Sequence, residues 1–403
     1  MSGKHIAVFN FPAHGHVNPS LPVVAELVRR GHRVTYFAPE NYHDAVAATG
    51  ATPVAYVSSA PTDWSTERIP AVITPEVVYT ALRFQVDEGF APLSAAERHL
   101  ADDRPDLIIY DQVAFHGGKL LARKWNVPAV MACTSFAANE LFSPYATVSE
   151  DFPVEIDPGH PDLLEMAKVV PAMLAEHGVP VEEFGARNEA ATIVYLPRFF
   201  QLGQEHFDDS YAFVGPSLGD GRRPDDTDWT PPTDGRPLLL ITMGSHDYEN
   251  RLQFYRDCVT AFADSPWHVV MAVGSRIDIT ELGPLPSHFE VHSWIPQTTI
   301  LAHAKAFLAH GGMGSVMEAL SHAVTPVVLP KLAEQGLIAD QVVALGVGRK
   351  IPPTEATPAR LRAAVDELAA DELAQQRVRQ VSADIHAAGG SVAAADAVEA
   401  VLP

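Results

Sequence analysis

Residues 306–320 read AFLAHGGMGSVMEAL, an apolar run that passes through a glycine turn into a helical pattern. Apolar runs followed by helical patterns recur along the whole chain. They span residues 5–11, 33–39, 53–57, 106–111, 128–133, 192–197, 211–216, 237–244, 267–274, 289–295, 306–310 and 325–330. Such runs are typical of buried parallel strands, and helices between them form crossover connections. The sequence therefore predicts an α/β protein with two doubly wound, Rossmann-like domains.

Length and one atypical segment support two domains. The chain has 403 residues, of which 47% are hydrophobic, so two cores can be filled at about 100–200 residues per domain. Residues 217–236 are rich in Pro, Gly and Asp and show no regular period, which indicates a linker. We predict an N-terminal domain over 1–216, a C-terminal domain over 237–385, and a last helix within 386–403 that packs back on the N-terminal domain.

The net charge of −22 disfavours nucleic acid and stable association with anionic membranes as partners. No apolar run reaches the length of a membrane span, and the N-terminal run is too short for a signal peptide. Cys133 and Cys258 lie far apart in apolar or helical stretches, so we expect buried free thiols. These features predict a cytoplasmic protein that acts on small molecules.

The glycine turn carries the first candidate site. Gly312 and Gly314 let a ligand approach the backbone, and the N-terminus of the following helix, which we expect at Ser315, favours phosphate. His310 and the Ser315 hydroxyl add hydrogen-bond donors, and Glu318 can accept from a ribose diol. A glycine-rich turn with a capping serine and a surface glutamate would show the same pattern.

A second candidate site follows the first strand, in FPAHGHVNPS. Ligands of doubly wound sheets bind past the carboxyl ends of the strands, where His14 and His16 are expected, ahead of a helix that begins near Asn18. Asp111 ends the fourth predicted strand at the same edge, so it can orient a histidine that acts as a general base. A core or capping histidine and a helix-capping Asp111 are the alternatives.

Further polar residues follow strands of the second half. Trp294 and Gln297 in SWIPQ suit a nucleotide base and its ribose, although a tryptophan packed on a proline turn is as common. The Ser245 hydroxyl in MGS can reach a phosphate. Glu334 and Gln335 in AEQ suit sugar hydroxyls, but an acidic residue is also favoured in a first helical turn.

The pattern excludes two kinds of site. The dinucleotide motif GxGxxG is absent after the first strand, and Met317 stands where the late loop would need its third glycine. Asp226 and Asp228 form a DxD pair, but they lie in the linker and away from strand ends. We therefore expect neither a dinucleotide cofactor nor a catalytic metal.

Aromatic residues in two less regular stretches can line a pocket for a hydrophobic ligand. The candidates are Trp64, Phe84, Phe136 and Phe142. For each of them, a place in the core is the alternative.

Taken together, the motifs FPAHGHVNPSL, WIPQ, HGGMGSVMEAL and AEQ resemble those of the UDP-glycosyltransferase superfamily, in particular its bacterial macrolide glycosyltransferases. The resemblance covers nearly the whole chain. It implies the GT-B architecture, in which two Rossmann-like domains face each other across a cleft, the N-terminal one binding acceptor and the C-terminal one binding a nucleotide sugar.

The resemblance also implies roles for the matching residues. His16 corresponds to the general base and Asp111 to its partner. Trp294 corresponds to the residue that stacks on the base, and Gln297 to a ribose or uracil contact. The diphosphate would be held by His310, Gly314 and Ser315, the ribose by Glu318, and the donor sugar by Glu334 and Gln335. His14 has no fixed role in the family.

Glu318 favours UDP as the donor nucleotide. A 2′-deoxyribose would leave a diol-reading carboxylate partly unpaired, at a cost of about 1–3 kcal/mol, and UDP-glucose is the default donor by resemblance. The resemblance thus implies inverting transfer without metal, to a macrolide antibiotic as in resistance, or to phenols and flavonoids. A non-catalytic binder of a hydrophobic metabolite and a UDP-sugar epimerase remain as alternatives.

Overall fold

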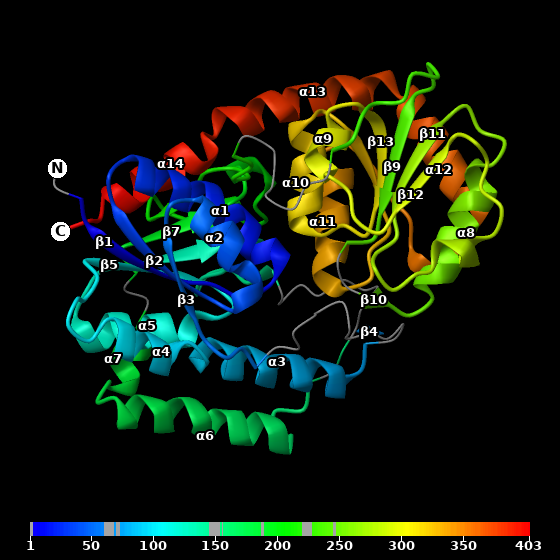
Figure 1. Ribbon diagram of the computed structural model, residues 1–403. Helices are drawn as coiled ribbons and strands as arrows, with labels where there is room; N and C mark the ends of the chain where they lie inside the picture. Colours follow the sequence, from blue (N-terminus) through cyan, green and yellow to red (C-terminus); the bar gives the residue numbers. More distant parts are fainter. Residues whose placement is uncertain are drawn as a thin grey trace.

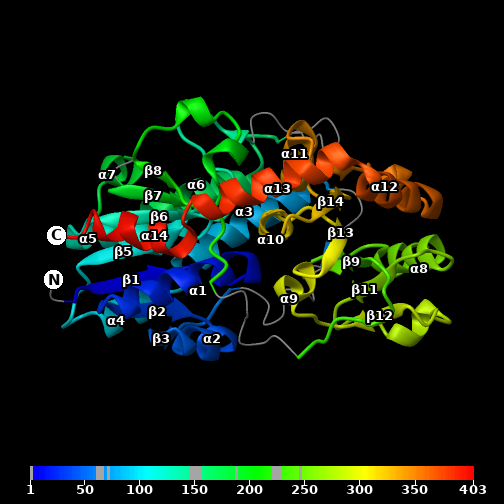
Figure 2. The ribbon, with the colours of Figure 1, turned by 90° about the horizontal axis from the view of Figure 1, so that it is seen from above.

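The computed structural model describes residues 3–59, 68–69, 73–144, 154, 156–186, 189–219, 228–244 and 247–403. It contains two parallel sheets covered by helices, one in each half of the chain (Figures 1 and 2). This confirms the predicted α/β class with two doubly wound sheets. None of the helices in these ranges is both long and apolar enough to cross a membrane.

The first sheet has seven strands in the order β3-β2-β1-β5-β6-β7-β8, and every neighbouring pair is parallel. Its strands are β1 (His5–Phe9), β2 (Arg33–Ala38), β3 (Thr52–Ala55), β5 (Leu107–Asp111), β6 (Ala129–Cys133), β7 (Ala191–Val194) and β8 (Tyr211–Phe213). The chain winds outward from β1 to β3 and then returns to start again at β5. The strand order therefore reverses between β1 and β5, which is where such sheets bind ligands.

Helices connect these strands and cover both faces of the sheet. They are α1 (His14–Arg29), α2 (His43–Ala48), α3 (Pro75–Phe90), α4 (Leu93–His99), α5 (Phe115–Trp125), α6 (Pro161–Glu176) and α7 (Val181–Gly185). Helix α1 begins at His14, four residues before the expected Asn18, and it continues through two internal prolines. His14 and His16 consequently lie in the first turn of a helix and are held more rigidly than loop residues.

The second sheet has six strands in the order β12-β11-β9-β13-β14-β15, again all parallel. Its strands are β9 (Leu238–Thr242), β11 (His268–Ala272), β12 (Phe289–His292), β13 (Ala304–Ala309), β14 (Thr325–Val328) and β15 (Arg349–Lys350). Its helices are α8 (Arg251–Phe262), α9 (Gln297–Leu301), α10 (Met313–Ser321), α11 (Ala333–Ala344), α12 (Pro358–Ala370) and α13 (Glu372–Ala387). Here the order reverses between β9 and β13.

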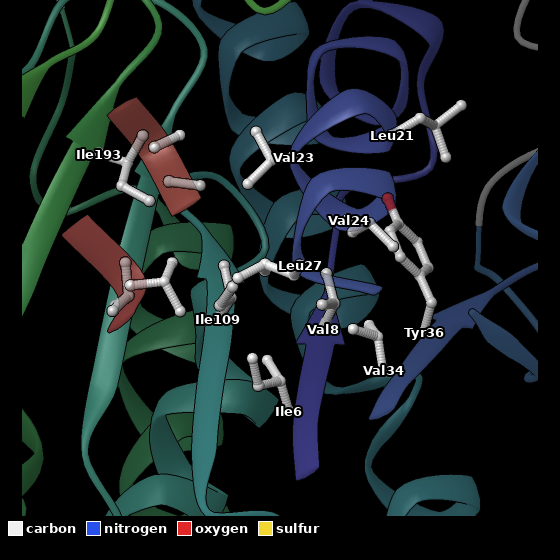
Figure 3. Close-up of a cluster of buried hydrophobic side chains, with 14 of the residues drawn as sticks. Ile6, Val8, Leu21, Val23, Val24, Leu27, Val34, Tyr36, Ile109 and Ile193 are labelled. Atoms are coloured by element: carbon white, nitrogen blue, oxygen red, sulfur yellow. The ribbon is translucent and has the colours of Figure 1, made fainter. Parts of the chain in front are cut away.

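One core cluster of the first domain lies between helix α1 and the strands β1, β2 and β5 (Figure 3), and a second cluster lies on the other face of the sheet. Leu27 of α1 and Ile109 of β5 point toward each other in the first of these clusters, and both are buried. This packing fixes α1, and with it the position of its first turn at the carboxyl edge of the sheet.

The last helix, α14 (Gly390–Glu399), packs against α1 and completes the same core through Ala394, Ala395 and Val398. Arg30 at the end of α1 binds Asp396 and Glu399, both at 2.6 Å. The chain thus crosses between its two halves twice, once after β8 and once between α13 and α14 (Figure 1).

The two crossings touch each other. The Gly390 N–H donates to the Val214 carbonyl at 2.7 Å, and a Cβ added at Gly215 would lie 3.1 Å from Ala388. Between the halves also runs a short parallel pair, β4 (Arg68–Ile69) with β10 (Asp247–Tyr248). The described part of the expected linker, 217–219 and 228–236, contains no helix or strand.

Candidate active site

The first part of the site lies at the reversal point of the N-terminal sheet. His16 sits in the first turn of α1, which follows β1, and Asp111 is the last residue of β5. The His16 Nδ1 lies 2.7 Å from the Asp111 Oδ2, and these side chains are 20% and 1% exposed. The sequence-predicted pair is therefore brought together, with an orienting carboxylate that water does not reach.

Asp111 is held by the backbone as well. Its other oxygen, Oδ1, accepts from the Val113 N–H at 2.7 Å. Asp111 does not cap the following helix α5, because the N-cap of α5 is Ala114 and no side chain caps it. One carboxylate oxygen thus holds the turn before α5, and the other faces His16. In the described residues no hydrogen bond is made by the His16 Nε2, so this nitrogen can take a proton from a substrate.

The surroundings set the charge of His16. Burial acts to lower the pKa of His16, but the Asp111 carboxylate, by its charge and its hydrogen bond, outweighs burial and raises the pKa above the ordinary 6.5. The charge of Glu334, from the other domain, adds to this increase. A negative group from the C-terminal half therefore lies close enough to act on the candidate base.

Sequence reasoning missed two residues that position His16. The Thr134 hydroxyl, directly after β6, lies 3.2 Å from the His16 Nδ1. The Asn10 amide, directly after β1, donates to the His16 carbonyl at 3.0 Å and to the Tyr36 hydroxyl at 2.8 Å. Both follow strands at the carboxyl edge, and that position was the only sequence signal that could have identified them.

The predicted acceptor residues occupy different environments. Phe84 on α3 contacts Phe11 at a centroid distance of 5.8 Å, and Phe11 contacts His16 at 5.0 Å. Phe136, in contrast, is buried in the core and stacks on Phe200, which is the alternative left open for it. Phe142 stacks on His206, and Trp64 lies outside the described residues. Phe84 alone of these is linked to the candidate base by the observed contacts.

The second part of the site lies at the reversal point of the C-terminal sheet. His310 follows β13 and packs closely against Gly244 after β9 and against Gly312. A Cβ at either glycine would come within 2.6 Å of the imidazole. Helix α10 begins at Met313 with Gly312 as its N-cap, so the expected start at Ser315 was two residues late.

Gly314 has a different environment. It lies in the first turn of α10, and a Cβ added to it would meet nothing within 4 Å. Packing in this structure therefore does not require a glycine at this position, and open space remains beside the helix N-terminus. Ser245, the other predicted phosphate contact, is outside the described residues.

Three predicted donor residues form one network. The Gln297 amide donates to the Glu318 Oε2 at 2.6 Å and to the Ser315 hydroxyl at 3.2 Å. Glu318 is 5% exposed, and Trp294 is 38% exposed. A buried carboxylate held by an amide is suited to a ribose diol, and a partly exposed indole is suited to a base.

Glu334 and Gln335 open helix α11, but their side chains differ. The Gln335 Oε1 accepts from the Lys331 N–H at 2.8 Å, and its amide donates to the Tyr248 hydroxyl at 3.0 Å. Gln335 therefore stabilises the first turn of its own helix in this structure. Glu334 is partly exposed, and its negative charge acts to raise the pKa of His16.

Cationic side chains near this edge were not predicted. Lys331 and Arg251 line a small cavity with Tyr248 at the carboxyl edge of the C-terminal sheet. Burial lowers the pKa of the Lys331 ammonium. For metals, no group of three or more His, Cys, Asp or Glu able to hold an ion occurs among the described residues.

Comparison with known proteins identifies relatives over the full length. Residues 260–400 match the family model of the erythromycin biosynthesis protein CIII-like C-terminal domain. The chain is 37% identical to the NDP-glycosyltransferase YjiC of Bacillus licheniformis, over 100% of this chain and 98% of that protein. It is 36% identical to the oleandomycin glycosyltransferase of Streptomyces antibioticus, over 99% and 91%.

A solved structure agrees in fold. The calicheamicin glycosyltransferase CalG4 superposes with a TM-score of 0.83 at 40% identity, covering 100% of this chain and 99% of that one. The overall fold and the sequence relationship are thus those of one family.

Proposed function

Because the chain belongs to the bacterial macrolide-type glycosyltransferases of the UDP-glycosyltransferase superfamily, we propose that it moves glucose from UDP-glucose to a hydroxyl of a hydrophobic acceptor. The observation that carries this proposal is the His16–Asp111 pair, whose Nδ1 and Oδ2 atoms lie 2.7 Å apart at the carboxyl edge of the N-terminal sheet. A macrolide antibiotic is the first acceptor to test, and phenols and flavonoids are the second class.

The reaction we propose is a direct displacement with inversion. His16 takes the acceptor proton at Nε2 while Asp111 stabilises the resulting imidazolium. The acceptor oxygen forms a bond to the anomeric carbon as the bond from that carbon to the UDP oxygen breaks. The sugar is thereby attached as a β-glucoside, and the bonding pair leaves with UDP.

The leaving diphosphate gains charge in this step, and we propose that protein groups stabilise it without a metal. His310, the hydroxyls of Ser315 and Ser245, and the N-terminus of α10 would supply the hydrogen bonds. The open space at Gly314 supports a ligand at this helix end. The buried Glu318 carboxylate supports a ribose with two hydroxyls, and therefore UDP over dTDP.

The experiment is a mass-spectrometric screen of the purified protein with UDP-glucose and a mixed panel of macrolides and phenols, with dTDP-glucose as the control donor. We expect a product heavier by one hexosyl residue with UDP-glucose. A product on macrolides alone would indicate a resistance enzyme, whereas products across phenols would indicate a permissive enzyme. Transfer from dTDP-glucose alone would contradict the donor assignment, and UDP binding with no product would contradict the proposed transfer.

Replacing His16 tests the chemistry. His16→Ala should lower the rate of transfer by about 10²–10⁴-fold, the usual contribution of a positioned base, and leave UDP affinity intact. A collapse of UDP affinity in a titration calorimeter would instead make His16 a donor ligand.

A further inference from the structure

His14 has no part in the chemistry described above, although it lies in the same helical turn as His16. It is the first residue of α1, and its side chain is partly buried. Among its contacts are one aromatic residue from each domain, Tyr42 and Trp294.

On the N-terminal side, the partner is Tyr42. The His14 and Tyr42 rings meet edge to face, with centroids 5.6 Å apart. Tyr42 is itself fixed, because it is buried in the core that contains α1 and its hydroxyl donates to the Pro12 carbonyl at 3.1 Å. The His14 imidazole is therefore packed against a rigid surface.

On the C-terminal side, the partner is Trp294, the residue expected to stack on the donor base. The ring centroids of His14 and Trp294 are 5.5 Å apart and the planes are inclined by 46°. Trp294 is 38% exposed. An indole with so much exposed surface gains orientation from each neighbour that packs on it.

We propose that His14 is a positioning residue, whose ring, packed on Tyr42, holds the Trp294 indole in the orientation that the donor base requires. Donor affinity would then depend on the apposition of the two domains, because the base site is completed by a residue of the acceptor domain. This inference rests on the proposed function for the identity of the donor.

The expected effect is on donor binding and not on chemistry. An aromatic contact of this kind changes an equilibrium by about 2- to 10-fold. His14→Ala should therefore raise the Kd for UDP and the KM for UDP-glucose by that factor, with kcat at saturating donor little changed. His14→Phe, which keeps a ring between Tyr42 and Trp294, should restore most of the affinity.

The measurement is calorimetric titration with UDP of the wild type, both His14 variants, Trp294→Ala and the double variant that combines His14→Ala with Trp294→Ala. A control is Arg29→Ala in the last turn of α1, whose exposed side chain pairs with Glu26 alone among the residues that the structure describes. If His14 acts through Trp294, His14→Ala should cost nothing further in the Trp294→Ala background. This comparison of single and double variants also separates a local effect from a general loss of folding.

Three results would overturn the inference. The first is an unchanged Kd in a folded His14→Ala protein, and the second is an equal loss in His14→Phe. The third is a full additional loss in the double variant. A wild type that binds neither UDP nor dTDP would overturn the proposed function, and this inference with it, so the two failures are distinguishable.

Discussion

At the scale of single residues, the site depends on polar side chains that hydrogen-bond two different partners through their two terminal atoms. Asp111 binds the backbone with one oxygen and His16 with the other. Gln335 accepts from its own helix turn and donates to Tyr248. Such residues orient a neighbour because they are themselves oriented, so their replacement should alter function more than stability.

The pH dependence of the reaction is one test at this scale. Transfer needs a neutral His16, so the rate should fall as pH drops through the His16 pKa, which the Asp111 and Glu334 charges hold above the ordinary 6.5. Asp111→Asn should move this fall to lower pH and reduce the plateau rate. Glu334→Gln should also move the fall in rate to lower pH, by a smaller amount than Asp111→Asn. A pH profile of kcat/KM for the acceptor measures both, and a shift to higher pH would contradict the assignment.

Gly314 offers a second test at this scale. Gly314→Ala should leave the free energy of unfolding unchanged or raise it by up to about 1 kcal/mol, because alanine favours a helix and the added Cβ meets no atom. The same methyl would occupy the space proposed for diphosphate, so UDP affinity should fall. Gly312→Ala is the contrast, because its Cβ would clash with His310 and should destabilise the fold. Urea unfolding of both variants measures the effect on stability, and UDP titration measures the effect on affinity.

At the scale of elements, the fold could be predicted because buried parallel strands leave continuous apolar runs. Each of the twelve predicted runs contains most of an observed strand. The strands β4, β10 and β15 have two residues each, which is too short to leave an apolar run in the sequence. Helix starts were also misjudged, since α1 continues through Pro19 and Pro22 and α10 is capped by a glycine without a side chain.

The candidate site was predictable only in part. Residues after strand ends, such as His16, Asp111 and His310, could be placed by topology alone. The burial of Phe136 and the hydrogen bond from Gln335 to Tyr248 depend on tertiary contacts, which a local sequence pattern does not show. The same holds for the contact between His14 and Trp294, whose residues are far apart in the chain.

Helix α14 gives a test at the element scale. Val398 is fully buried in the core beside α1, so Val398→Ala should lower the free energy of unfolding by about 2–3 kcal/mol. Val392 lies on the same helix but is 51% exposed. Val392→Ala should therefore change the free energy of unfolding by less than about 0.5 kcal/mol. Equal effects in urea unfolding would show that α14 does not belong to the core of the N-terminal domain.

At the scale of the whole molecule, the two crossings of the chain meet near Gly215. Gly215 has a φ of +74° and lies against Ala388. Gly235 has the same φ, but a Cβ there would meet nothing within 4 Å. Both changes to Ala should cost about 1–2 kcal/mol in backbone strain, and Gly215→Ala should cost more because of the contact. Thermal unfolding of both variants tests this difference. Equal losses of stability would mean that the contact between the two crossings does not contribute to stability.

The short parallel pair of β4 and β10 is a further connection between the two halves, away from the two chain crossings. In Figure 1 the junction of α13 and α14 lies at the upper side of the molecule and the β4–β10 pair at the lower side. If the halves move apart about the junction of α13 and α14, the β4–β10 pair has to separate, because it joins the two halves. In the described part of the chain the pair joins two residues on each strand, and each hydrogen bond contributes about 0.5–1.5 kcal/mol. Because the Tyr248 hydroxyl of β10 also accepts from the Gln335 amide, the β4–β10 pair connects a segment of the N-terminal half to the first turn of α11.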